Sequence, residues 1–380
     1  MTQTRTSDSV EKPTFCRLCE AYCGIVATVK DGKVIAIRPD KDNPHSLGHV
    51  CVKGMAVGDL TNDPDRLLTP MKRIGGPGEF VPVSWDEAMS DIAARLKVIL
   101  DRDGGDALAL YHGNPVGFAT DFVVAVKPFL KALGAHKRYH AGSQDHHAHL
   151  AANYYAYGDA ERSSFPDLVN CDFLLMLGTN PLVSNGSLVF APRMRHDLDA
   201  IAARGRVVVV DPRRSETARR YEHLPVEPAG DLWLLLGMMR TLIEEQLVDS
   251  RFIGQMTEGW DDLRTGALSV SMEEAAARSG IAVETIQSLA RDFAKTERAA
   301  IYGRLGICRG PHGSLTAFLI LALNIVAGKF GKKGGRVRRQ NIWRNLQRKL
   351  AECGPRLGVD VIPNCAVGDS HGGIPCRLKV

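Results

Sequence analysis

Four cysteines near the start of the chain have a spacing that suits metal binding. Cys16, Cys19, Cys23 and Cys51, called the cluster cysteines below, follow the pattern C-x2-C-x3-C-x27-C. Four thiolates are the number that a [4Fe–4S] cube requires, and three close ligands with one distant ligand can surround it. A four-cysteine zinc site usually presents two short pairs, which fits this pattern less well. A third interpretation is four ordinary cysteines, some of them buried as small hydrophobic residues. We predict the cluster.

A β-hairpin is predicted between the third and the fourth cluster cysteine. Residues 26–29 and 33–37 carry alternating apolar positions around Asp31-Gly32, a dipeptide that favours the tight turn of a two-residue hairpin. Such a hairpin would carry the chain from the three clustered cysteines toward Cys51.

The next part of the chain alternates strand and helix signals. Ser84 and Glu87 form a capping box before a helix, and residues 120–133 form a second helix that ends at Gly134. Residues 107–111, between these helices, are predicted as a buried strand. This alternation is typical of α/β layers. We therefore predict an α/β fold in which doubly wound domains follow a small β-rich module.

The clearest α/β unit lies in the middle of the chain. An apolar strand at residues 172–177 leads into Gly178-Thr179-Asn180-Pro181, and a second strand at residues 206–210 ends at Asp211 and Arg213. Doubly wound sheets place glycine-containing turns, acidic residues for ribose or guanine and arginines for phosphate at such strand ends. The alternative is that Asp211 and Arg213 are exposed loop residues. No G-x-G-x-x-G sequence occurs in this unit, which disfavours an NAD-type Rossmann domain.

Residues 138–158, called the histidine loop below, are polar and rich in histidine. The loop holds four imidazoles and one carboxylate that could act in chemistry, namely His140, Asp145, His146, His147 and His149. The last three histidines are too crowded along a helix to bind one ion together. The alternative to a metal site is a solvated or pocket-lining loop. His146 and His147 could transfer protons beside a metal, because imidazole titrates near neutral pH.

The order of these motifs resembles the first part of the bis-molybdopterin guanine dinucleotide oxidoreductases, a family that includes formate dehydrogenases and nitrate reductases. The resemblance covers residues 14–335. Besides the cluster cysteines, it rests on Val52-Lys53-Gly54, residues 62–67, Gly178-Thr179-Asn180-Pro181, Val183-Ser184-Asn185-Gly186 and Glu227-Pro228-Ala229-Gly230-Asp231. It implies a [4Fe–4S] cluster together with molybdenum, or tungsten, held by bis-molybdopterin guanine dinucleotide.

The resemblance also implies roles for single residues. Lys53 matches the family's lysine between cluster and pterin. Counting back from Tyr157-Gly158, Asp145 matches the protein ligand to the metal, with Ser143 as the alternative, and His146 follows it. The lack of a cysteine there argues against a formate dehydrogenase or a cysteine-ligated nitrate reductase. The predicted contacts with the pterin dinucleotide are Gly178, Asn180, Pro181, Asp211, Arg213, Gly230 and Asp231.

The resemblance implies a domain order as well. We expect a disordered N-terminus at residues 1–14, the cluster module at 15–70, the first part of an α/β domain at 71–144, the dinucleotide-binding α/β domain at 145–298, a return to the first α/β domain at 299–335, and a basic tail outside the family pattern at 336–380. The family's C-terminal β-rich pterin-binding domain is expected to be missing. Our hypothesis for the tail is out-of-frame coding or an unrelated extension.

Composition bounds the class and the location of the protein. With 380 residues, 44% of them hydrophobic and 24% charged, the chain suits a soluble globular protein of two or three domains. Residues 1–14 lack a signal-peptide core, and no apolar run could span a bilayer, so we expect a cytoplasmic protein. The net charge of +5 comes from the tail, because 12 Lys and Arg face 3 Asp and Glu from Lys329 onward. Nucleic-acid binding by this tail is disfavoured, since it contains few aromatic residues and no recognised module.

We predict a molybdopterin-dependent oxidoreductase, truncated at its C-terminus, that carries out two-electron redox chemistry or oxygen-atom transfer and passes electrons through the [4Fe–4S] cluster. A small-molecule substrate and a redox partner protein or subunit are expected. Three other classes stay open: an inactive iron–sulfur fragment, an electron-transfer subunit whose partner supplies the missing domain, and a four-cysteine zinc protein with a basic nucleic-acid-binding tail. Bound molybdenum would indicate the enzyme. Iron without molybdenum would indicate a fragment or an electron carrier, and zinc without iron would indicate the zinc protein.

Overall fold

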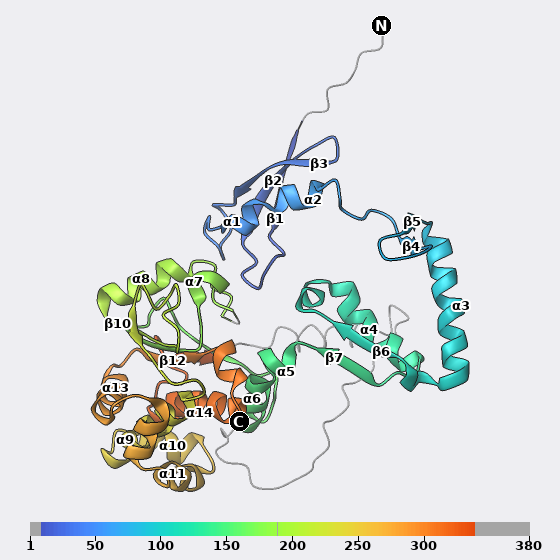
Figure 1. Ribbon diagram of the computed structural model, residues 1–380. Coiled ribbons are helices and arrows are strands. Elements are labelled where there is room, and N and C mark those ends of the chain that lie inside the picture. Colours follow the sequence, from blue (N-terminus) through green and yellow to red (C-terminus); the bar gives the residue numbers. More distant parts are fainter. Residues whose placement is uncertain (1–8, 188, 339–380) are drawn as a thin grey trace. The chain divides into compact units, whose positions relative to one another are not determined.

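The computed structural model describes residues 9–187 and 189–338, which divide into two compact units (Figure 1). Within the described residues, the first unit contains residues 9–141 and Phe190–Pro192. The second unit contains residues 142–187, Val189 and residues 193–338. Each unit is described by itself below.

The first unit begins with a three-stranded antiparallel sheet in the order β1-β2-β3. Asp31 and Gly32, which connect β2 to β3, have φ values of +49° and +76°. Two successive residues of positive φ are typical of a type I′ turn, and they confirm the predicted hairpin. The sheet and the two short helices that follow it are β1 (Val10–Phe15), β2 (Gly24–Lys30), β3 (Lys33–Pro39), α1 (Val52–Met55) and α2 (Val57–Asn62).

The prediction of disorder at residues 1–14 is wrong for residues 10–14. Val10 to Phe15 pair with β2 in an antiparallel register that joins Val10 to Val29 and Phe15 to Gly24. All six residues of β1 have exposed side chains, so apolar periodicity could not have predicted this strand. Backbone hydrogen bonds to β2 stabilise it instead. Residues 1–8 lie outside the described part of the chain.

The rest of the first unit alternates strands and helices as predicted. Ser84 caps α3, because its hydroxyl accepts a hydrogen bond from the Glu87 amide at 3.1 Å. Strand β6 was expected to be buried, but Ala109 and Tyr111 are exposed in it. Among the described residues, β6 pairs in parallel with β7 alone, and its faces are not covered as those of a strand in a larger parallel sheet would be. The elements are β4 (Met71–Arg73), β5 (Phe80–Pro82), α3 (Trp85–Asp103), β6 (Ala109–His112), α4 (Thr120–Ala132) and β7 (Lys137–His140).

The second unit is built on a parallel sheet of four strands in the order β11-β10-β9-β12. Every residue of β9 and of β12 is buried, because helices cover the sheet and leave the strands continuously apolar. The strands are β9 (Phe173–Leu177), β10 (Arg206–Val210), β11 (Glu222–Leu224) and β12 (Ala299–Gly303).

Helices surround this sheet. A small antiparallel pair of strands, β8 (Ser164–Pro166) and β13 (Arg336–Arg338), completes the unit. Helix α14 is the most deeply buried, as predicted for its apolar sequence. The buried Asn324 in α14 bonds both backbone groups of Ile301 in the edge strand β12, at 3.0 and 3.2 Å. The helices are α5 (Gly142–Asp145), α6 (His147–Tyr157), α7 (Pro181–Ser184), α8 (Met194–Arg204), α9 (Asp231–Glu244), α10 (Ser250–Met256), α11 (Trp260–Leu268), α12 (Met272–Ser279), α13 (Val283–Lys295) and α14 (Gly313–Val326).

Two domain boundaries differ from the prediction. Residues 299–335 were expected to return to the first α/β domain, but β12 pairs with β9 inside the second unit. The buried Arg336, placed in the tail by the sequence analysis, pairs in β13 with β8 of the same unit. Both corrections come from strand pairing between segments more than 100 residues apart, which local sequence patterns do not specify. Residues 339–380 of the predicted tail lie outside the described residues.

Candidate cluster and cofactor site

The sheet of the first unit brings two cluster cysteines together. Cys16 directly follows β1 and Cys23 directly precedes β2, and the two strands pair up to this point. The Cys16 amide donates a hydrogen bond to the Cys23 carbonyl at 2.8 Å. Cys51 is the residue before α1, and its carbonyl accepts the first helical hydrogen bond from Met55 at 3.1 Å. The antiparallel sheet and a short helix thus position the predicted iron ligands.

The four thiols form one electrostatic group. Cys16 and Cys23 are buried, with 6% and 4% of their surface exposed, while Cys19 and Cys51 are half-buried. Burial raises the pKa of the Cys16 thiol and raises the pKa of Cys23 to about 11, and charges on the other cluster cysteines would raise both pKa values further. Such thiols stay protonated at neutral pH unless a metal cation displaces the proton. This donor set fits an iron–sulfur cluster, whose positive iron ions stabilise four nearby thiolates.

Two residues after Cys51 also approach the thiols. The positive charge of Lys53 lowers the pKa of Cys16, although burial has a larger effect in the opposite direction. The Lys53 side chain is exposed, but its charge is close enough to affect this thiol. A Cβ atom at Gly54 would lie 3.5 Å from the Cys16 sulfur and 2.6 Å from a methyl group of Val50. Glycine therefore keeps the backbone of α1 close to the sulfur.

The second predicted site lies at the carboxyl edge of the parallel sheet. The chain leaves β9 toward β10 on one side, and β12 pairs on the other side, so the strand order reverses between β9 and β12. Ligands of doubly wound sheets bind at such a switch point. Gly178 follows β9 with φ of +56°, and Gly306 lies in the loop after β12. A Cβ atom on Gly178 would come within 2.8 Å of the Gly306 Cα atom, so the two loops touch backbone to backbone.

Buried polar atoms without partners lie in the segments at this edge. Thr179 and Asp231 are 4% and 7% exposed, and within the described residues neither the Thr179 hydroxyl nor Oδ1 of Asp231 has a hydrogen-bond partner. Burial raises the pKa of Asp231 to about 6, and the negative charge of Asp211 adds to this rise. Buried polar groups are normally hydrogen-bonded. Groups of this kind fit a bound nucleotide that supplies donors and acceptors, which supports the predicted pterin dinucleotide.

Other predicted contacts have roles within the protein. The Asn180 side chain accepts from the Thr217 amide and hydroxyl at 3.2 and 2.7 Å and donates to Glu216 at 2.7 Å. Asn180 thus joins the loops after β9 and β10. Pro181 is buried as the first residue of α7. A contact of Asn180 or Pro181 with the cofactor stays a prediction.

Asp211, Arg213 and Gly230 lie at the ends of their elements, as predicted. Asp211 accepts a hydrogen bond from the Arg213 amide at 2.8 Å, while the Arg213 side chain is exposed. Gly230 precedes α9, and a Cβ atom there would lie 2.8 Å from the Glu227 carbonyl oxygen. Asp231 is then the first residue of α9, where the helix dipole favours a negative charge. Their contacts with a nucleotide stay predictions.

The histidine loop places Asp145 against an arginine that the sequence analysis did not select. Oδ1 of Asp145 lies 2.9 Å from a guanidinium nitrogen of Arg304, whose side chain is only 5% exposed. Burial lowers the pKa of His146 and lowers the pKa of His149 to about 3, so both imidazoles are neutral at physiological pH. Arg304 directly follows β12, and its position at the carboxyl edge was the available signal. Local sequence patterns do not give the strand order, and it is the strand order that identifies this edge as the place where a ligand would bind.

A cavity of about 580 Å³ opens beside this loop. Ser143 and His147 line it from the histidine loop, and Cys308 and His312 line it from the segment between β12 and α14. Cys308 is buried, as predicted, and burial raises its pKa to about 11. The other side chains that line the cavity are mostly small and apolar. A few hydroxyl and imidazole groups among them suit the binding of a small polar molecule.

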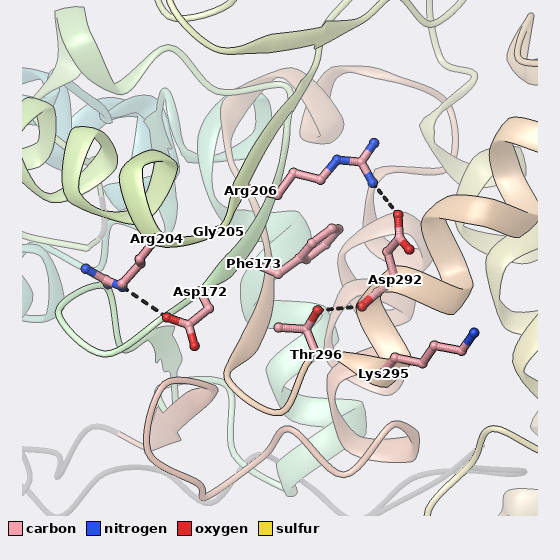
Figure 2. Close-up of a pocket in the computed structure, with 8 residues that line it drawn as sticks. All are labelled: Asp172, Phe173, Arg204, Gly205, Arg206, Asp292, Lys295 and Thr296. Atoms are coloured by element: carbon pink, nitrogen blue, oxygen red, sulfur yellow. Dashed lines mark hydrogen bonds and ion pairs between the residues drawn. The ribbon is translucent and has the colours of Figure 1, made fainter.

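A second pocket, of about 350 Å³, lies at the opposite end of the sheet (Figure 2). Phe173 and Arg206 begin β9 and β10, so this pocket is at the amino edge of the strands. Arg206 pairs with Asp292 at 2.5 Å, and Arg204 pairs with Asp172 at 3.0 Å. Both arginines are thus paired within the protein, and nucleotides bind doubly wound sheets at the carboxyl edge rather than at this one. We assign no function to this pocket.

The described residues contain no group of three His, Cys, Asp or Glu side chains close enough for a single metal ion. They also contain no helix with the length and apolarity that crossing a membrane requires.

Comparison with known proteins identifies the family. Residues 10–63 match the molybdopterin oxidoreductase Fe4S4 domain, and residues 66–365 match molybdopterin oxidoreductase. The chain therefore belongs to the molybdopterin oxidoreductase family and carries the family's Fe4S4 domain. The predicted family, the α/β fold class and the pairing of a molybdopterin cofactor with a [4Fe–4S] cluster are confirmed. The Fe4S4 match favours the cluster over the zinc interpretation.

The sequence identity to individual relatives is below 30% in the three comparisons that follow. The chain is 29% identical over 325 residues to F420-dependent formate dehydrogenase 2 subunit alpha of Methanococcus maripaludis, covering 84% of this chain and 46% of the relative. It is 28% identical over 326 residues to formate dehydrogenase H of Escherichia coli, covering 84% and 45%. The structure of acetylene hydratase from Pelobacter acetylenicus has the same fold, with a TM-score of 0.74 at 24% identity, covering 86% of this chain and 44% of that one. The chain thus spans less than half the length of these relatives.

Proposed function

We propose that this protein is a molybdopterin-dependent oxidoreductase that acts on a small molecule. The bound molybdenum or tungsten cofactor would supply two-electron redox chemistry or oxygen-atom transfer, and the cluster would carry single electrons. The observation that carries the proposal is the combination of two sites in one chain. Four interacting thiols lie in the Fe4S4 module, and the carboxyl edge of a parallel sheet has buried polar atoms that find no hydrogen-bond partner in the described part of the chain.

The roles of single residues follow from their positions. Cys16, Cys19, Cys23 and Cys51 would hold the cluster, and their partial burial limits the access of water to it. Lys53 would place a positive charge beside the cluster. A cation there stabilises the more negative, reduced state of a cluster and would raise its reduction potential.

At the carboxyl edge, Gly178 and Gly230 would let a ligand approach the backbone closely, and Asp211 and Asp231 would accept hydrogen bonds from it. Asn180, Pro181 and Arg213 complete the proposed nucleotide site. Asp145 would bind the metal through a carboxylate oxygen, with Ser143 as the alternative. His146, neutral because it is buried, can accept or donate a proton beside it.

The substrate and partners are proposed at the level of class. The cavity between the histidine loop and α14 would admit a small polar substrate. Electrons would pass between the cluster and a redox partner protein or subunit. The six cysteines of the described chain are all free thiols, which suits the reducing cytoplasm that we propose as the location.

Metal analysis of anaerobically purified protein, together with its visible absorption spectrum, tests the proposal. We expect about four iron atoms per chain, a broad absorption band that bleaches on reduction, and molybdenum or tungsten at near-stoichiometric amounts. Iron without either metal would refute the oxidoreductase proposal and favour an electron-transfer subunit. Zinc in place of iron would refute the cluster assignment.

A further inference from the structure

We infer that Arg304 is a positioning residue for Asp145, and that it bonds one carboxylate oxygen so that only the other is available to the metal. This inference rests on the proposed function, because Asp145 is the proposed ligand. It goes beyond that proposal because Arg304 belongs to none of the predicted sites.

The geometry of the pair carries the inference. Asp145 is the last residue of α5, and Arg304 directly follows β12, so the contact joins segments 159 residues apart in sequence. The guanidinium lies 2.9 Å from Oδ1 of Asp145 and also reaches the Asp145 carbonyl at 3.5 Å. Its Nε donates to the Ser187 hydroxyl at 3.0 Å. Three contacts to two segments hold the planar guanidinium in one orientation.

Burial makes this orientation persistent. The Arg304 side chain is 5% exposed, whereas the Asp145 side chain is 26% exposed. A buried guanidinium needs an anionic partner, since removal from water is costly for an unpaired charge. Asp145 supplies a carboxylate to this guanidinium, and the more exposed aspartate is held by the more buried arginine. Arg304 contacts Oδ1 and the backbone carbonyl of Asp145, so Oδ2 is the oxygen left for a metal.

The pair has a chemical consequence for ligation. A carboxylate that shares one oxygen with a guanidinium is a weaker electron donor through the other oxygen, and it cannot turn to bind through both. Arg304 would therefore determine both the orientation and the donor strength of the metal ligand. Burial, with a smaller effect of the Arg304 charge, lowers the pKa of His149 to about 3, so this imidazole is neutral and does not compete for the carboxylate.

The first experiment measures the pair without any cofactor. Arg304→Gln, Asp145→Asn and the double variant are unfolded with urea in cofactor-free protein. Each single variant is expected to raise the equilibrium constant for unfolding about 10- to 100-fold, because it leaves a buried or half-buried charge without its partner. The double variant is expected to be no worse than the worse single variant. Additive effects would overturn the pairing.

The second experiment uses the full chain with its cofactors and does not depend on activity. We expect Asp145→Asn and Arg304→Gln both to shift the g values of the Mo(V) EPR signal, with iron content unchanged, and Arg304→Lys to restore most of the wild-type signal. Arg206→Gln is the matched control, since Arg206 pairs with Asp292 at the other edge of the sheet. It should change stability and leave the EPR signal unaltered.

The outcomes separate this inference from the proposed function. A signal that changes in Asp145→Asn but stays unaltered in Arg304→Gln would overturn the positioning role and leave the proposed function intact. A wild-type protein that binds iron but no molybdenum or tungsten would overturn the proposed function, and with it the role of Arg304 toward a metal.

Discussion

Replacing Asp231 with asparagine should stabilise the cofactor-free protein at neutral pH. Asp231 is 7% exposed, and Oδ1 has no hydrogen-bond partner within the described residues. Burial, with a smaller effect of Asp211, raises the pKa of Asp231 from 3.8 to about 6. Each pKa unit corresponds to about 1.4 kcal/mol, so ionised Asp231 costs the folded protein about 3 kcal/mol. The loss of a negative charge in the first turn of α9 offsets about 0.3–1 kcal/mol of the gain. We expect a net stabilisation of about 2 kcal/mol.

The effect should depend on pH with a definite sign. Because the folded pKa lies above the unfolded one, the folded protein holds this proton more tightly, and the resulting stability is fully present below pH 3.8. It is lost as the pH rises through about 6. Asp231→Asn should therefore match the wild type in its free energy of unfolding near pH 4, exceed it increasingly between pH 4 and 6, and keep a constant advantage at higher pH.

Urea unfolding at several pH values, followed by tryptophan fluorescence, measures this difference; Trp233 lies in α9 itself. Asp261→Asn is the matched control, because Asp261 is exposed in the first turn of α11. It should lose about 0.3–1 kcal/mol at neutral pH through the helix dipole. Equal stability of the wild type and Asp231→Asn at pH 8 would refute the reasoning, since it would mean that the buried carboxylate has found a partner.

Three further predictions concern other residues. Cys51→Ala should lower the iron content and the visible absorption of anaerobically purified protein, while Cys171→Ala, which removes a buried thiol remote in sequence from the cluster cysteines, should leave iron unchanged. Gly178→Ala should lower the free energy of unfolding in urea by about 2 kcal/mol or more, because φ is +56° and the added Cβ atom would meet backbone at 2.8 Å. Gly254→Ala in α10 is the control: its Cβ atom meets nothing within 4 Å, and it should stabilise the protein by about 0.5–1 kcal/mol. Asn324→Leu should lower the melting temperature, with a loss of about 1–3 kcal/mol, because it removes the partner of the buried Ile301 amide, while the Ile301 carbonyl keeps its hydrogen bond from Arg336 at 2.7 Å.

Each of these predictions has a clear contrary result. Full iron content in Cys51→Ala would remove Cys51 from the set of cluster ligands. If Gly178→Ala is as stable as Gly254→Ala, the loops after β9 and β12 are not packed against each other as described. An Asn324→Leu protein with an unchanged melting temperature would mean that the edge of β12 is satisfied by other groups.

Local patterns in the sequence were sufficient to predict an Fe4S4 module and most regular elements. The three close cysteines, the Asp31-Gly32 turn and the Ser84 cap are short-range features, and their physical effect depends on neighbours within a few residues. The buried strands β9 and β10 were predicted closely for the same reason, since a continuous apolar run needs cover on both faces wherever it occurs.

Pairing between distant segments decided the rest. The place of β12 beside β9, the membership of Arg336 in the second unit and the strand at residues 10–14 all depend on backbone hydrogen bonds to remote strands. Backbone groups are alike in every residue, so side-chain patterns do not show which strand will pair with which. The ion pair of Asp145 and Arg304 has the same origin.

The sequence by itself therefore determined the chemistry that is available: four thiols for a cluster, a carboxylate and imidazoles in one loop, and glycines at strand ends. The tertiary structure decided which of these groups share a site and in what state. It buried Oδ1 of Asp231 and the Thr179 hydroxyl without hydrogen-bond partners among the described residues, raised the pKa of Cys23 to about 11, and fixed the Asp145 carboxylate against a buried guanidinium. Burial and distance set these properties, and both exist only when segments far apart in the chain have packed together.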